Sequence, residues 1–139
     1  MRRILIVDDQ MATRRALRAV LAEKDTLIFE ADSLFSAKLL ARALHRNGKL
    51  DLIVSDYDLG ASLIFKYRLF DGFRFLRWGA VHKISDKLIL HSSVFELHKR
   101  FGLFVHKNLL GVFKRARRFH IQVQPKSNLL GEGTSWKCP

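Results

Sequence analysis

Short runs of branched apolar residues recur along the chain, and each is too short for a buried helix. We therefore interpret these runs as strands. They are "ILIV" at 4–7, "TLIFEAD" at 26–32, "LDLIVSD" at 50–56, "KLILHSS" at 87–93 and "GLFVHK" at 102–107. Since most are apolar on both faces, they should be buried from both sides, as in a parallel sheet covered by helices.

Between these runs the apolar residues follow a helical period. The first helix is expected after Gln10, with Ala16, Leu17, Val20 and Leu21 on one face. The second should be capped by Asp32, Ser33 or Ser36 and should end at Asn47-Gly48. A short helix is expected around 73–78 and a last one over 109–119, where the basic residues face outward.

The alternation of strands and helices predicts a doubly wound α/β fold with a five-stranded parallel sheet. The length of 139 residues suits one domain. We place this domain at 1–122 and interpret 123–139 as a C-terminal tail. In such folds, ligands bind at the carboxyl ends of the strands.

The net charge of +12 is the extreme feature of the composition. From Lys99 onward, Glu132 is the only acid among many bases, which favours weak, nonspecific association with polyanions. No apolar run is long enough to cross a membrane. The single Cys138 cannot form an internal disulfide, so we expect a cytoplasmic protein.

Polar residues that can do chemistry follow four of the predicted strands. Asp8 and Asp9 follow the first, Asp56 and Asp58 the third, Ser92 the fourth and Lys107 the fifth. Each signal is weak by itself, since an aspartate at a strand end is more often a turn former. Their order along one α/β chain is much harder to obtain by chance.

With these residues the sequence resembles the receiver domain of bacterial two-component response regulators. The matching segments are "ILIVDDQ", "DLIVSDYDL", "DGFRFL", "LILHSS" and "LFVHKN", spread from Arg2 to about Phe119. The resemblance implies a flavodoxin-like strand order, 2-1-3-4-5. It also implies a signalling domain that accepts a phosphoryl group from a histidine kinase or a phosphotransfer protein and acts on a downstream protein.

The resemblance also implies roles for individual residues. Asp56 would be the phosphoacceptor, and Asp8, Asp9, Asp56 and the backbone carbonyl of Asp58 would hold Mg²⁺. Lys107 and Ser92 would contact the phosphoryl group, and Ser92 and Phe104 would form the conformational switch. Carboxylate oxygens suit Mg²⁺, and a carboxylate nucleophile can form an acyl phosphate.

The chain departs from the usual family pattern in three places. Asn108 stands where proline usually follows the strand-five lysine. The connection from Asp56 to Gly72 is long, and 92–107 leaves room only for a shortened fourth helix. The apolar segment 61–70 either fills the place of that helix or forms a surface that binds a partner, and a second copy of the chain is one possible partner.

Two other functions fit parts of the sequence. "LIVSDYDLG" also resembles the Asp-x-Asp motif of haloacid-dehalogenase-like phosphatases, in which Asp56 would be the nucleophile and Asp58 the general acid. That family places the motif after the first strand and needs a later acidic motif. A basic nucleic-acid-binding module is the non-enzymatic alternative, based on Lys114, Arg115, Arg117 and Arg118.

Overall fold

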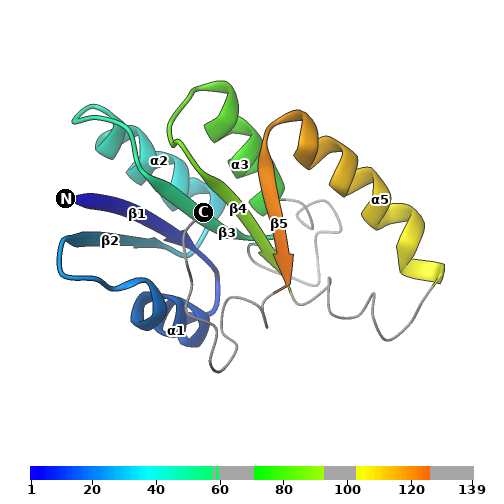
Figure 1. Cartoon of the computed structure of the whole chain (residues 1–139), viewed down its shortest axis with the longest axis horizontal. Helices are drawn as coiled ribbons and strands as arrows, with labels where there is room; N and C mark the ends of the chain where they lie inside the picture. Colours follow the sequence, from blue (N-terminus) through cyan, green and yellow to red (C-terminus); the bar gives the residue numbers. More distant parts are fainter. Residues whose placement is uncertain (58, 60–70, 93–102, 126–139) are drawn as a thin grey trace.

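The computed structural model describes residues 1–57, 59, 71–92 and 103–125, with backbone alone at 92, 103–110 and 125. Strands and helices alternate along this part of the chain (Figure 1). The elements are β1 (Arg2–Val7), α1 (Met11–Leu21), β2 (Thr26–Ala31), α2 (Leu34–His45), β3 (Leu52–Asp56), α3 (Asp71–Val81), β4 (Leu88–Ser92), α5 (Leu103–Arg118) and β5 (Ile121–Pro125).

The strands form one five-stranded sheet in the order β2-β1-β3-β4-β5. Every neighbouring pair is parallel. The predicted fold class and strand order are therefore confirmed. Because all the strands run the same way, their carboxyl ends meet at one edge of the sheet.

Two apolar layers cover the two faces of the sheet. On one face, side chains such as Leu5, Ile53 and Leu90 pack with α2, α3 and α5. On the other face, Ile4 and Val54 pack with α1. Figure 1 shows α2, α3 and α5 on one side of the strands and α1 on the opposite side. Consecutive strand residues point to opposite faces of the sheet. Once the residues on one face are known, the direction of every other side chain in the strand follows.

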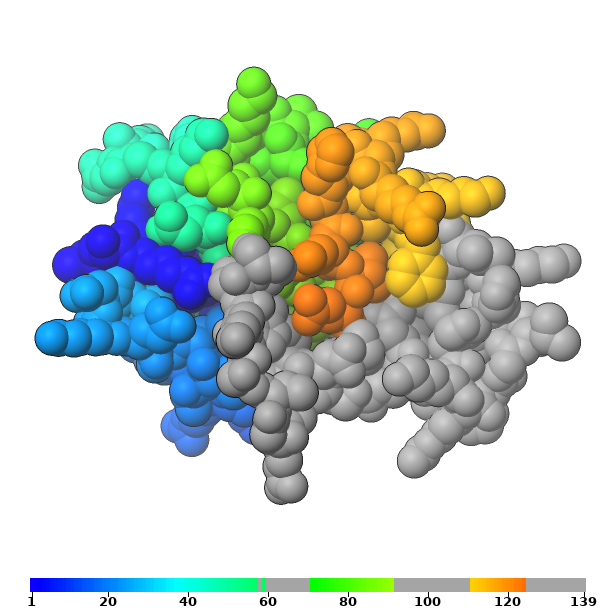
Figure 2. All heavy atoms as spheres, in the orientation of Figure 1, coloured from blue at the N-terminus to red at the C-terminus, as the bar shows by residue number. Residues whose placement is uncertain are grey.

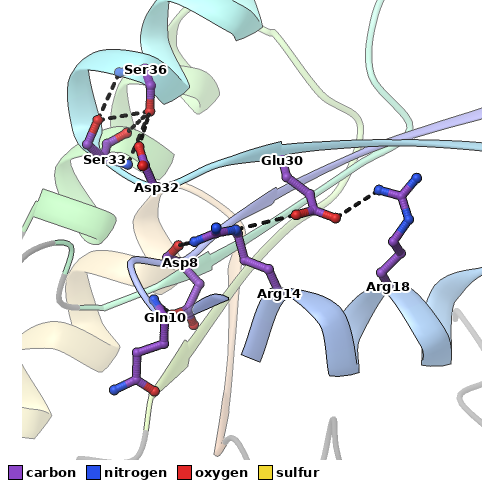
Figure 3. Close-up of polar contacts among 8 residues, drawn as sticks. All are labelled: Asp8, Gln10, Arg14, Arg18, Glu30, Asp32, Ser33 and Ser36. Carbon is purple, nitrogen blue, oxygen red and sulfur yellow. Dashed lines mark hydrogen bonds and ion pairs between the residues drawn. The ribbon is translucent and has the colours of Figure 1, made fainter. Parts of the chain in front are cut away.

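Helix α2 begins at a capping box in which Ser33, one of the three expected cap residues, is the N-cap. The Ser33 hydroxyl accepts a hydrogen bond from the Ser36 backbone N–H at 3.2 Å, and the Ser33 N–H donates to the Ser36 hydroxyl at 3.1 Å. Ser36 Oγ also donates to Asp32 at 3.1 Å (Figure 3). These bonds satisfy backbone donors that the first turn of a helix leaves without partners.

An ion-paired group attaches α1 to β2. Arg18 and Arg14 both contact the Glu30 carboxylate, at 2.8 Å and 3.4 Å (Figure 3). The hydrogen bond from Arg18, helped by its charge and by Arg14, lowers the pKa of Glu30 from its ordinary value of 4.5, although burial opposes the shift. The group fixes the position of α1 beside the sheet.

The prediction for the last strand is wrong, whereas the helix expected over 109–119 is confirmed but begins earlier, at Leu103, and precedes the last strand. Residues 103–107 do not form a strand; they are the start of α5, which runs on to Arg118 and precedes β5. The short run "LFV" fits a buried strand and a helix equally well, since periodicity cannot separate the two over so few residues. The strand is instead "IQVQP", whose apolar residues alternate with glutamines, a pattern suited to its place at the edge of the sheet.

The position of the last strand at Ile121–Pro125, and not at 102–107, affects two related expectations. Helix α5, with 16 residues, lies between β4 and β5. The shortened fourth helix expected within 92–107 falls mainly on 93–102, outside the described residues, and stays a prediction. The expected domain boundary at 122 falls inside β5, and the sheet therefore includes three positions of the predicted tail. The apolar segment 61–70 lies outside the described residues.

The surface of the described part carries many long basic side chains. In Figure 2 the side chains of α5, in yellow and orange, extend outward from the body of the molecule. Within the described ranges, no helix combines the length and the apolar character needed to span a bilayer.

Candidate metal centre

Two carboxylates and an imidazole meet at the carboxyl edge of the sheet. Asp8, Asp56 and His91 each offer one ligand atom, and these atoms lie within 4.8 Å of one another. All three residues are buried, with exposed fractions of 0%, 5% and 0%. Polar side chains are rarely buried together in this way unless they serve a binding or catalytic function or balance each other's charge.

The register of the sheet explains why these three residues meet. Val7 pairs with Ser55, so Asp8 and Asp56 are the next residues along β1 and β3. Asp56 in turn pairs with His91 on β4. By the alternation of strand side chains, each of the three continues the series that points to the α1 face.

Asp8 is held in place by the backbone and by α1. Its Oδ1 accepts a hydrogen bond from the Gln10 N–H at 2.8 Å, and its own N–H donates to the Ala31 carbonyl at 3.1 Å. Arg14 donates from Nη1 to the Asp8 carbonyl at 2.8 Å (Figure 3). The same arginine contacts Glu30, so the ion-paired group on α1 also positions this carboxylate.

Asp56 lies where the start of α3 meets the end of β3. The Gly72 N–H donates to the Tyr57 carbonyl at 3.2 Å, and the Tyr57 N–H donates to the His91 carbonyl at 3.0 Å. A Cβ at Gly72 would lie 1.5 Å from the Asp56 carbonyl oxygen, which no side chain can tolerate. Glycine is therefore required for α3 to begin this close to Asp56.

A third buried acid begins α3. Asp71 is 6% exposed, and its carboxylate lies 3.9 Å from the Arg74 guanidinium. An acid in the first turn is favoured by the positive end of the helix dipole. Asp71 thus helps to fix the helix end that closes over the Asp56 backbone, and we give it this structural role.

His91 is the site residue that sequence reasoning missed. Its Nε2 lies 3.7 Å from Asp8 Oδ2, close enough for an ion pair when the imidazole is protonated. In the sequence His91 looks like one more residue of a buried strand. The signal that would have identified it is the register of β4 against β3, which the sequence alone does not provide.

The other predicted site residues do not all join this centre. Asp9 is exposed and is not one of the three clustered residues. Asp58 lies outside the described residues. Ser92 ends β4, and only its backbone is described, opposite Pro125 of β5. Phe104 lies in the first turn of α5, again with only its backbone described. The roles proposed for these residues stay predictions.

The element predicted to carry Lys107 is wrong, because the residue lies in α5 and not at the end of a strand. The side chain of Lys107 is outside the described part, so its contact with a phosphoryl group also stays a prediction. The sequence places another lysine, Lys126, directly after the last residue of β5.

Comparison with solved structures supports the fold. The chain is similar to the signal receiver domain of an HD domain-containing protein from Pseudomonas fluorescens Pf-5, with 17% identity, 86% of this chain and 89% of that chain covered, and a TM-score of 0.50. A second signal receiver domain, from Vibrio parahaemolyticus, gives 16% identity, 86% and 94% coverage, and a TM-score of 0.48. No protein-family model and no curated protein matches. The first of these similarities, together with the strand order, shows that the chain has the fold of signal receiver domains.

The donor set of the centre fits a divalent cation. Two carboxylates supply hard oxygen ligands, which Mg²⁺ and Mn²⁺ favour. The imidazole of His91 adds a nitrogen ligand, which suits later transition metals better than Mg²⁺. A cation between Asp8 and Asp56 would also offset the repulsion between two buried carboxylates.

Proposed function

We propose that this chain is a response regulator receiver domain that accepts a phosphoryl group on Asp56 with the help of a divalent cation. The observation that carries the proposal is the burial of Asp8 and Asp56 at one edge of a 2-1-3-4-5 parallel sheet, with ligand atoms within 4.8 Å. The fold supports a signalling domain, and the position of Asp56 at the end of β3 supports its role as acceptor.

The transfer replaces one bond to phosphorus by another. An Asp56 carboxylate oxygen attacks the phosphorus of a phosphohistidine on a sensor kinase or phosphotransfer protein. The P–N bond breaks, an acyl phosphate forms, and the released imidazole nitrogen takes up a proton. The transition state spreads negative charge over the phosphoryl oxygens, so positive charge at fixed positions accelerates the reaction.

The cation belongs beside Asp8 and Asp56, with Asp9 and the Asp58 carbonyl as further ligand candidates. Mg²⁺ is the ion that the receiver resemblance implies, and it would neutralise phosphoryl charge when bound. Arg14 and Gln10 would hold Asp8 and not the ion: the Gln10 N–H bonds the Asp8 carboxylate, and Arg14 bonds the Asp8 backbone carbonyl. His91 would complete the donor set from β4.

A lysine is expected to contact the phosphoryl group, and two residues are candidates. Lys107 is the residue that the sequence resemblance indicates, whereas Lys126 follows β5 directly in the sequence. We favour Lys126, because the receiver pattern requires a lysine after strand five and β5 ends at Pro125. Replacing each lysine with alanine separates the two: the essential lysine should slow phosphorylation strongly, and the other should leave it nearly unchanged.

Phosphorylation would add about −1.5 to −2 charge at Asp56 and would shift a two-state equilibrium of the domain. Ser92 at the end of β4 and Phe104 in α5 are the switch residues that the resemblance implies, and the repacked surface would be the one that a downstream protein reads. A homodimer on this surface remains an alternative output.

Incubation with acetyl phosphate and Mg²⁺, followed by intact mass spectrometry, tests the proposal. We expect a labile gain of one phosphoryl group that Asp56→Asn abolishes. Asp86→Asn is the matched control, because Asp86 is an exposed aspartate whose partner is Lys49; it should be labelled like the wild type. No gain in the folded wild-type protein would contradict the proposal. Continuous phosphate release from small esters that requires Asp58 would instead indicate a phosphatase.

A further inference from the structure

The most distinctive surface outside the metal centre is a cavity of about 340 Å³ between α3 and α5. Four arginines line it: Arg74 and Arg77 from α3, and Arg115 and Arg118 from α5. The apolar part of its wall consists of Phe73, Val112 and Phe119. Figure 2 shows α3, in green, beside the orange end of α5 on the surface.

The spacing of the arginines brings like charges together. Each pair is three residues apart on its helix, which puts both side chains on the same face. In the described part of the chain, Asp71 is the only acid in an ion pair with any of the four, at 3.9 Å from Arg74. The other three have no acidic partner there, so the cavity carries an excess of positive charge that is unfavourable in itself.

The chemistry of the lining points to a phosphate-bearing ligand. All four cations of the wall are arginines, whose planar guanidinium binds phosphate in a bidentate manner, whereas Lys114 and Arg117 do not line it. Phe119 is partly exposed and supplies most of the aromatic surface, since Phe73 is only 7% exposed. The Arg77 guanidinium lies 5.4 Å from the centre of the Phe119 ring, which extends this surface and holds the arginine in place.

We propose that this cavity binds a nucleotide, with its phosphates among the arginines and its base against the Phe119 side of the wall. The volume lies in the range of small-ligand pockets, roughly 300–1,000 Å³. Four guanidinium groups match the charge of a di- or triphosphate, and base-on-aromatic stacking occupies the apolar wall. The proposal is independent of phosphorylation at Asp56 and goes beyond it.

Isothermal titration calorimetry with ADP at low ionic strength tests the proposal. EDTA is included so that no divalent cation occupies the metal centre. We expect saturable binding of ADP. Pyrophosphate and adenosine should each bind much more weakly than ADP. Arg118→Gln and Arg115→Gln should each weaken binding at least about fivefold, since each removes a charge-assisted hydrogen bond. Arg117→Gln is the matched control, because Arg117 is exposed on the same helix but does not line the cavity; it should weaken binding less than about twofold.

Three results would overturn the proposal. The first is no binding of ADP at millimolar concentration. The second is equal loss in Arg117→Gln and Arg118→Gln, which would indicate diffuse attraction of polyanions, including nucleic acid, along α5. The third is pyrophosphate binding as tight as ADP binding, which would make this an anion site without a base. Thermal melts of each variant ensure that the comparison is made between folded proteins.

Discussion

At the level of single residues, His91 changes the chemistry of the acidic site. It places an imidazole beside two buried carboxylates, with Nε2 at 3.7 Å from Asp8. A purely carboxylate site would favour hard cations such as Mg²⁺, whereas a mixed oxygen and nitrogen site also accommodates transition metals. The identity of the bound ion is therefore a test of the role of this one side chain.

We predict that the wild-type protein binds Co²⁺ more tightly than Mg²⁺ and that His91→Gln reduces this preference on the order of tenfold. Removing the nitrogen ligand should affect Co²⁺ much more than Mg²⁺. The visible absorption of bound Co²⁺ and competition titrations with Mg²⁺ measure both effects. His82→Gln, at an exposed histidine, is the control. An unchanged Co²⁺ spectrum in His91→Gln would show that His91 is not a ligand.

Glu30 gives a prediction for pH. Its pKa is lowered in the folded protein, first of all by the hydrogen bond from Arg18. Its contribution to stability is therefore present above the ordinary pKa of 4.5 and is lost as the pH falls through the lowered folded value. Glu30→Gln should cost about 0.5–1 kcal/mol at pH 7, since both arginine pairs are partly exposed.

Urea denaturation of Glu30→Gln and wild type over a pH series measures this effect. The difference in unfolding free energy should shrink as the solution becomes more acidic. Glu23→Gln is the control, because Glu23 is 66% exposed and its pair with Arg2 is long, at 3.8 Å; it should have a smaller effect. If the difference in unfolding free energy between Glu30→Gln and wild type stayed constant over the whole acidic range, the charge of Glu30 would not stabilise the fold.

At the level of elements, the close approach of α3 to β3 determines where the Asp56 backbone lies. Gly72→Ala would place a carbon 1.5 Å from the Asp56 carbonyl oxygen, so the start of α3 has to move. We expect a loss of stability of about 1–3 kcal/mol or more, together with slower phosphorylation. Chemical denaturation and the acetyl phosphate reaction measure the two effects.

Gly79→Ala in the same helix is the control. A Cβ at Gly79 would make ordinary contacts of 3.8 Å with Ile53 and Leu88, so the space for it exists. Alanine is the better helix former by about 0.5–1 kcal/mol, and this variant should be neutral or more stable. If the two variants behaved alike, the close approach at Gly72 would not be what determines the effect.

The elements also show how far the sequence could be interpreted. Asp8 and Asp56 were predictable, because each lies at the end of an apolar run that is long and β-branched enough to be recognised as a buried strand. His91 was not predictable, since its place beside Asp56 depends on the register between β3 and β4. The expected strand at 102–107 is wrong because a run of three apolar residues fits the helical period as well as the strand period. The strand β5 was not recognised because its apolar residues alternate with glutamines.

At the level of the whole molecule, opposite charges are separated in space. Asp8 and Asp56 lie at the carboxyl edge of the sheet, on the series of residues that faces α1, whereas the arginine cavity lies between α3 and α5. The net charge of +12 raises the local concentration of anions, including phosphorylated ligands, around the protein. Since this attraction is screened by salt, binding at the cavity should weaken as ionic strength rises, whereas cation binding by the buried acids should change less.

The most direct test of the account is to locate a cation by anomalous diffraction from crystals soaked in Mn²⁺. We expect one strong peak at coordination distance, about 2.0–2.2 Å, from the carboxylates of Asp8 and Asp56 and from His91 Nε2. A peak elsewhere, or no peak at this edge of the sheet under saturating Mn²⁺, would contradict the claim that these three strands build one metal centre.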